Sequence, residues 1–94
     1  MSLDKNYTIK ELDSIELMGS LFFSLEDIAA FLQYDKLSFV ADACIEGSDA
    51  YMRYNQGWLK SEIKLRQSIM ESAENGSNPA QAIIMKIQQN NAHE

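Results

Sequence analysis

The stretch from Ser48 to Asn75 limits the possible folds more than any other part of this sequence. It contains no proline and one interior glycine, Gly57, and its apolar residues recur at helical spacing, so it predicts one long helix. When successive residues are placed about 100° apart, the apolar residues fall on two lines. The first line holds Met52, Leu59, Ile63 and Met70, and the second holds Tyr51, Tyr54, Trp58, Leu65 and Ile69.

Only a narrow polar face remains on this helix. It consists of Asp49, Arg53, Gln56, Lys60, Lys64, Gln67 and Glu71. A helix that is apolar over more than half its circumference must be buried on two sides. We therefore expect one side to face its own domain and the other, through the Tyr51–Ile69 line, to face a partner subunit. Gly57 predicts a close approach of another helix, with a kink as the alternative, because an exposed interior glycine costs about 1 kcal/mol relative to alanine.

Three helix-start signals precede the long helix. Thr8 and Glu11 form a capping box, with Tyr7 and Leu12 as its hydrophobic staple, and predict a helix to about Gly19. Its apolar set is Ile9, Leu12, Ile15, Leu17 and Met18.

The second and third starts follow closely on one another. Ser24 predicts a helix from Leu25 to Gln33, with Phe23 stapled to Ile28, and Asp35 predicts one from Lys36 to Cys44, with Tyr34 packed on Phe39. The short connection between them requires a steep angle, as in a helix-turn-helix.

The second half is expected to contain the long helix and one more. Ser48 caps the long helix, Asp49 is placed to pair with Arg53, and Glu62 is placed to pair with Arg66. The helix ends at Asn75-Gly76, where glycine takes the left-handed conformation.

A last helix starts with Asn78 as cap and Pro79 at its first position, and frays in the polar run QQNN. Its expected buried stripe is Ala80, Ile83, Ile84 and Ile87. The sequence therefore predicts a single all-α domain over residues 1–94, of about five helices. It comprises a helix-turn-helix-like three-helix unit (7–46) and an oligomerisation region (48–90) formed by one long helix and a short C-terminal helix.

Charge and composition narrow the functional classes. The net charge is −6, with −7 in residues 1–50 and +1 in residues 51–94. An acidic chain is not typical of a generic nucleic-acid binder, and it argues against an anionic membrane surface as partner. No apolar run approaches the roughly 20 residues that span a bilayer, and no signal peptide is evident. We expect a soluble cytoplasmic protein, for which a single cysteine is suitable.

No set of residues amounts to catalytic machinery. His93 is the only histidine, and Cys44 is expected to be a small buried hydrophobe. The acidic residues Asp13, Glu16, Glu26 and Asp27 are spread along two helices and are best explained as a solvated face rather than a metal site. We expect no enzyme activity, no cofactor and no metal.

DNA binding is the functional hypothesis with a structural basis. In a helix-turn-helix the second helix offers its N-terminal side chains to base edges, and here these are Lys36, Ser38 and Asp42. Phosphate contacts are expected from the polar face of the long helix, by Arg53, Lys60 and Lys64. The alternative is an ordinary solvated face that carries both signs of charge.

The order of motifs resembles that of phage small terminase subunits and their prophage-encoded helix-turn-helix relatives. The segments that carry the resemblance are SLEDIAAFL from Ser24, then Phe39, Ala50-Tyr51, Tyr54-x-x-Gly57, Glu62-x-x-Leu65-Arg66, and Ala73-x-x-Gly76-Ser77-x-Pro79-Ala80. They cover roughly residues 22–88. Gln33 stands where a helix-turn-helix often has glycine, and the expected recognition helix is poor in basic residues.

The resemblance implies a division of labour. The helix from Lys36 to Cys44 would recognise DNA, and the long helix from Ser48 would assemble subunits into a ring that hands DNA to a large packaging ATPase. The leading hypothesis is thus a non-catalytic DNA-recognition and packaging accessory protein. A second hypothesis is a helical protein-interaction or scaffold module that does not bind DNA.

Overall fold

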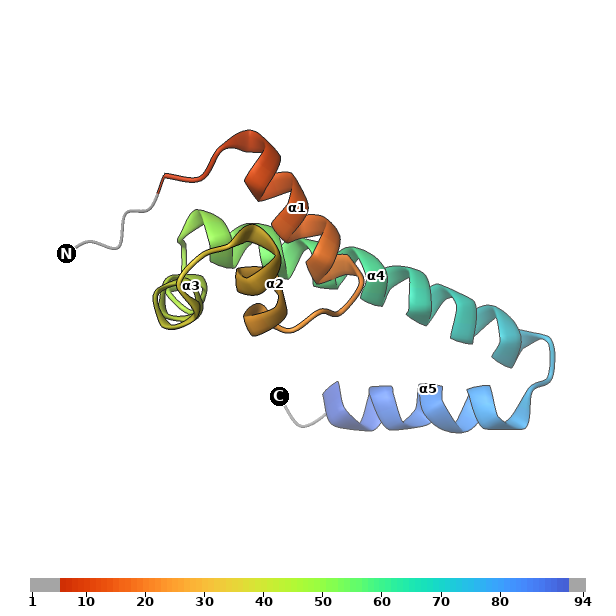
Figure 1. Cartoon of the computed structure of the whole chain (residues 1–94). Coiled ribbons are helices and arrows are strands. Elements are labelled where there is room, and N and C mark those ends of the chain that lie inside the picture. Colours follow the sequence, from red (N-terminus) through yellow and green to blue (C-terminus); the bar gives the residue numbers. More distant parts are fainter. Residues whose placement is uncertain (1–5, 92–94) are drawn as a thin grey trace. The chain divides into compact units, whose positions relative to one another are not determined.

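The computed structural model describes residues 6–91, and all of the regular structure in that range is helical. The five helices are α1 (Ile9–Ser20), α2 (Leu25–Leu32), α3 (Lys36–Ala43), α4 (Asp49–Glu74) and α5 (Asn78–Asn91), as Figure 1 shows. The prediction of an all-α fold with about five helices is confirmed. None of these helices is both long enough and apolar enough to cross a membrane.

The chain divides into two compact units, Met1–Ser61 and Glu62–Glu94. The boundary therefore lies inside α4 and not at the Gly47-Ser48 break. The first unit contains α1, α2, α3 and the first half of α4, while the second contains the rest of α4 and α5.

The predicted start signals of the first four helices act as expected. Thr8 and Glu11 form a reciprocal capping box, in which the Glu11 N–H donates to Thr8 Oγ1 at 3.1 Å and the Thr8 N–H donates to Glu11 Oε1 at 2.9 Å. Ser24, Asp35 and Ser48 each accept a hydrogen bond from a backbone N–H three residues later. Each cap satisfies a donor that has no partner inside its helix.

The cap of α5 differs from the prediction by one residue. Ser77, not Asn78, is the cap: its Oγ accepts from the Ala80 N–H at 3.3 Å, and its carbonyl accepts from the Gln81 N–H at 3.0 Å. Asn78 is already helical, so Pro79 is the second residue of α5. A serine hydroxyl reaches the third following N–H as readily as an asparagine amide does, and local spacing alone did not distinguish the two.

Three helices end in a left-handed residue. After α1, α2 and α4 the residues Phe22 (φ 64°), Gln33 (φ 62°) and Gly76 (φ 96°) turn the chain. In each case the next N–H bonds back to a carbonyl five residues earlier, which is the Schellman arrangement. Gln33 thus adopts, at a non-glycine residue, the conformation for which glycine is preferred. Phe22 does the same, although the left-handed region is unfavourable for a bulky side chain.

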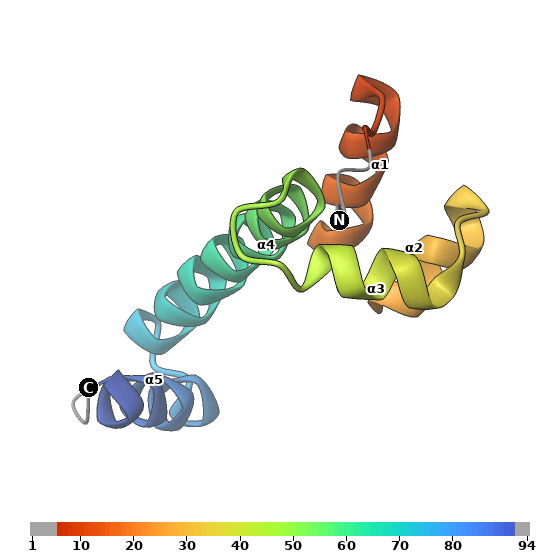
Figure 2. The ribbon, with the colours of Figure 1, turned by 90° about the vertical axis from the view of Figure 1, so that its left-hand side faces the viewer.

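The core of the first unit lies among α1, α2, α3 and the start of α4. Its buried apolar residues are Leu12, Ile15, Ile28, Ala29, Phe39, Ala43 and Ala50. Figure 2 shows α3 lying beside α2, with a short turn between them. The predicted contact of Tyr34 with Phe39 is confirmed, since their rings stack with centroids 5.7 Å apart.

Tyr7 ties the chain before α1 to α3. Its hydroxyl donates to Oδ2 of the buried Asp42 at 2.5 Å, and its ring packs edge-on against Tyr34 and Phe39. Burial, together with the hydrogen bond to Asp42, raises the pKa of Tyr7 well above the ordinary tyrosine value. A tyrosine held neutral in this way satisfies a carboxylate that would otherwise be costly to bury.

α1 and the first half of α4 cross in backbone contact. A Cβ added at Gly57 would lie 2.0 Å from the Glu16 carbonyl oxygen, and a Cβ added at Gly19 would lie 2.6 Å from the Tyr54 carbonyl oxygen. The Ser61 hydroxyl continues this contact by donating to the Ser20 carbonyl. The prediction that Gly57 marks a close approach of another helix is confirmed.

The second unit is a short helical hairpin. Gly76 makes the turn, and the Gln81 side-chain amide donates to the Ala73 carbonyl at 3.0 Å. Of the predicted stripe on α5, Ala80 is buried, Ile84 and Ile87 are half-buried, and Ile83 is exposed. The expected fraying at QQNN is wrong, because α5 continues to Asn91.

Candidate functional site

Two of the residues predicted to bind phosphate, Arg53 and Lys60, form ion pairs inside the first unit. Arg53 donates through Nε to Glu16 Oε1 at 2.8 Å and through Nη2 to Asp13 Oδ1. Lys60 pairs with the other oxygen of Glu16. The predicted pair of Asp49 with Arg53 is wrong, because Arg53 pairs with α1 across the Gly57 crossing instead.

Glu16 is the centre of this ion-pair network. The hydrogen bond from Lys60, joined by that from Arg53, holds the pKa of the Glu16 carboxyl below its ordinary value. The polar face of the long helix therefore faces α1 over its first half and is not free to follow a DNA backbone there. The sequence could not reveal this, since residues 16 and 60 are far apart in the chain.

The first turn of α3 is open to solvent. Lys36, Leu37 and Ser38 are all exposed, Leu37 to 79%. No carboxylate in residues 6–91 pairs with Lys36. The Ser38 N–H is held by the Asp35 cap, which leaves the Ser38 hydroxyl on the surface. By contrast, Asp42 was expected to be a possible base contact and is 4% exposed, so it belongs to the core.

Lys64 belongs to the second unit. It is exposed, and among the described residues it forms no ion pair. Arg66 nearby pairs with Glu62 at 3.5 Å, as its i, i+4 spacing predicts.

The predicted oligomer-interface residues have unequal surroundings. Tyr54 is half-buried, its hydroxyl donates to the Phe23 carbonyl at 2.8 Å, and it accepts from Trp58 Nε1 at 3.1 Å. The Trp58 ring packs edge-on against Phe22 with centroids 4.4 Å apart, yet it remains 39% exposed. These two side chains thus already contact the α1–α2 connection of their own chain.

The other predicted interface residues are only partly covered by their own chain. Tyr51 and Ile69 are half-buried and Leu65 is 49% exposed. The first apolar line of α4 is exposed throughout, at Met52, Leu59, Ile63 and Met70.

An apolar groove between α1 and α2 was not predicted. Its volume is about 470 Å³, and it is lined by Ser14, Leu17, Met18, Phe23, Asp27 and Phe31. Leu17 and Ile9, both members of the apolar set of α1, are 60% and 72% exposed. The signal available in the sequence was the surplus of apolar residues on α1, whose buried stripe uses only Leu12 and Ile15.

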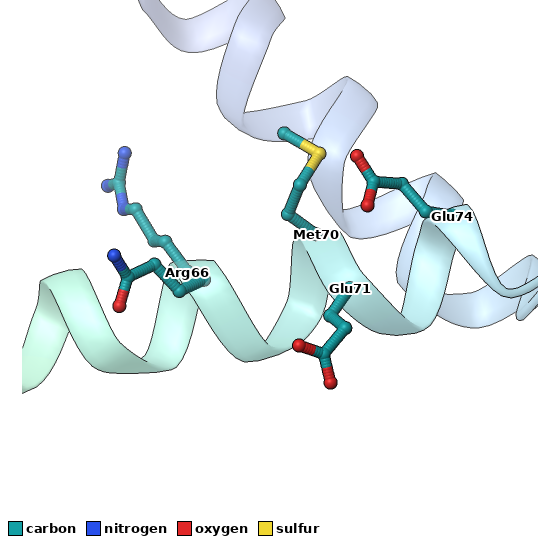
Figure 3. A pocket seen from close by; sticks show the side chains of 5 residues that line it. Arg66, Met70, Glu71 and Glu74 are labelled. Carbon is teal, nitrogen blue, oxygen red and sulfur yellow. The ribbon is translucent and has the colours of Figure 1, made fainter.

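A second hollow lies on the second half of α4. It has a volume of about 380 Å³ and is lined by Arg66, Gln67, Met70, Glu71 and Glu74. Figure 3 shows Met70 and Glu74 on the side of α5 and Glu71 pointing away from it. Within residues 6–91 no group of three or more potential metal ligands converges.

The remaining candidates from the sequence are Cys44 and His93. Cys44 was expected to be buried, but it is exposed at the C-terminal cap of α3. His93 lies outside the described residues.

The comparisons with known proteins give no family for this chain. It matches no protein-family model, no curated protein and no solved structure.

Proposed function

We propose that this chain is a non-catalytic, self-assembling DNA-recognition and packaging accessory protein of the small-terminase kind. The observation that carries the proposal is the exposed first turn of α3, which follows α2 after a three-residue turn. Gln33 supplies the left-handed turn residue there. This arrangement offers Lys36 and Ser38 to a major groove, the position from which recognition helices contact base edges.

Self-assembly is supported by the very small number of buried residues in the second unit. In residues 62–91 only Ala80 is buried, while Ile63, Leu65, Met70, Ile83 and Met85 are exposed. Polypeptides of this size rarely bury enough apolar surface by themselves. Packing against the same region of other subunits would cover these residues. An assembly of several subunits would also present several weak DNA contacts at once, which raises the overall affinity.

The proposed DNA contacts are narrower than those expected from the sequence. Lys36, Ser38 and Lys64 remain candidates, whereas Arg53 and Lys60 are assigned to holding α1 against α4. Substitution of Lys60 would therefore weaken the fold of the first unit and would affect DNA only indirectly.

The test compares Lys36→Glu with Lys10→Glu, which changes an exposed lysine on α1 by the same charge. Affinity for duplex DNA is measured by fluorescence anisotropy over a range of salt concentrations. Lys36→Glu should weaken binding, because it replaces a cation in the proposed groove contact with a carboxylate, and it should flatten the salt dependence, because the interface loses a positive charge. Equal effects of the two variants would contradict the proposed DNA contact.

A second candidate function is a helical protein-interaction module that does not bind DNA. It is favoured by the ion pairs that Arg53 and Lys60 form with Glu16 and by the net charge of −6. Absence of DNA binding at low salt, in an otherwise folded and assembled chain, would select this function over the first.

A further inference from the structure

We propose that the groove between α1 and α2 is a docking site for a basic amphipathic helix of a partner protein. The groove belongs entirely to the first unit and is distinct from the first turn of α3 and from the exposed residues of the second unit. This inference does not depend on DNA recognition.

Most of the residues that line the groove are apolar, and their side chains are exposed or half-buried. Leu17 is 60% exposed and Phe31 is 66% exposed, while Met18 is half-buried and packs against the core cluster. Phe23, from the connection between α1 and α2, also lines the groove and is 40% exposed. Isolated exposed apolar residues are ordinary, but four that line one hollow between two helices are typical of an interaction surface.

The two walls have the geometry of a helix-binding groove. Ser14, Leu17 and Met18 follow one another at i, i+3 and i+4 on α1, and Asp27 and Phe31 follow at i and i+4 on α2. A partner helix laid between such walls would insert apolar residues spaced i, i+3 or i+4, and i+7. The volume of about 470 Å³ is sufficient for a few large side chains and not for a whole helix, so the rest of the partner would remain on the rim.

Charge determines which kind of helix fits. The only charged group in the lining is the Asp27 carboxylate, and no cation in residues 6–91 pairs with it. Glu26 is exposed beside it, and the first unit, residues 1–61, carries a net charge of −5. Lys10, one turn before Ser14 on α1, is not part of the lining. A helix with lysine or arginine beside its apolar residues is therefore complementary, whereas an acidic helix would be repelled.

The experiment uses the full chain and two synthetic helical peptides with the same leucine pattern, at i, i+3, i+4 and i+7. One peptide carries lysines at its remaining positions and the other carries glutamates. Binding is measured by isothermal titration calorimetry and located by amide chemical-shift changes. The lysine peptide should bind and shift the signals of the groove residues, and the glutamate peptide should not bind.

Matched variants distinguish binding in the groove from nonspecific binding to exposed apolar residues. Phe31→Ser should weaken binding of the lysine peptide about tenfold or more, whereas Leu37→Ser removes a still more exposed apolar residue from α3 and should leave binding unchanged. Asp27→Asn should weaken binding about twofold to fivefold, and Glu26→Gln, outside the lining, should weaken it less.

Several results would overturn the proposal. These are equal binding of both peptides, equal loss of binding in Phe31→Ser and Leu37→Ser, and no binding of either peptide. Loss of self-association in Phe31→Ser would assign the groove to a second copy of the chain and would likewise overturn it. None of these results bears on the DNA affinity of Lys36→Glu, so failure of the two proposals can be told apart.

Discussion

The two units of this chain differ in how they are stabilised. The first unit buries Ile15, Ile28 and Phe39 completely and joins α1 to α4 through backbone contact at Gly57. The second unit buries only Ala80 among its described residues and relies on caps and the turn at Gly76. α4 therefore has buried residues, Ala50 and Gly57, only in the part that belongs to the first unit.

This difference indicates where a second molecule is needed. Side chains that contact α1 in the first unit, such as Arg53 and Lys60, should affect the folding of the isolated chain. Exposed apolar side chains of the second unit should affect association and have little effect on folding.

The largest expected effect comes from Gly57→Ala. The new methyl group would overlap the backbone of α1 at Glu16 and Ser20, and neither backbone atom can move without shifting the helix. We expect a loss of about 3 kcal/mol or more in the free energy of unfolding, measured by urea denaturation. Gly47→Ala is the control: nothing lies within 4 Å of its Cβ, and its φ of +92° should cost only about 1–2 kcal/mol. Equal losses would mean that the helices do not cross in backbone contact.

The next effect is on association. Leu65→Ser removes an apolar side chain that is 49% exposed and has no place in the first unit's core. We expect self-association to weaken by about 2 kcal/mol, roughly thirtyfold in dissociation constant, with an unchanged circular dichroism spectrum. Sedimentation of Leu65→Ser and of the control Leu37→Ser measures this effect. A native chain that is strictly monomeric would remove the assembly role from the second unit.

A smaller effect is expected at the ion-pair network. Glu16→Gln should cost about 1 kcal/mol of stability, because Arg53 and Lys60 both lose a charged partner.

The same network gives a direction for the pH dependence. The pKa of Glu16 is lowered on folding, so its contribution to stability is complete above the ordinary glutamate value of 4.5 and is lost as the pH falls through the lowered pKa. The difference in stability between the native chain and Glu16→Gln should therefore shrink on acidification below pH 4.5. A difference that stays constant down to acid unfolding would contradict this role of Glu16.

The smallest effect tests the turn between α2 and α3. Gln33 is exposed and left-handed, so Gln33→Gly should relieve backbone strain. The gain is offset by the greater entropy of glycine in the unfolded chain, which leaves a stabilisation of about 0.5 kcal/mol. Thermal denaturation measures it, and a clear destabilisation would show that the glutamine side chain itself supports the turn.

The helices and most of their ends could be predicted because they depend on neighbours in the chain. The Thr8–Glu11 capping box and the turn at Gly76 are satisfied within a few residues, and both are found as predicted. The one wrong cap, at Ser77, involved two adjacent residues of similar capping ability. Gly57 could be interpreted as the site of a helix–helix contact, because glycine inside a helix lowers its stability and close packing of another helix would offset that loss.

The candidate site depended on contacts between distant residues, which sequence patterns do not specify. Arg53 appeared to belong to a solvated face, and only the packing of α1 across Gly57 brought Asp13 and Glu16 to it. Asp42 was predicted as a base contact, but its carboxylate accepts a hydrogen bond from Tyr7 within the core. The exposure of Leu17 and Phe31, and with it the α1–α2 groove, likewise follows from how the helices pack. The sequence by itself determined five helices and a tight contact at Gly57, because helix formation and glycine's missing side chain are local properties. Tertiary structure alone decided which charges are paired and which apolar residues stay exposed, because burial depends on what packs against a residue.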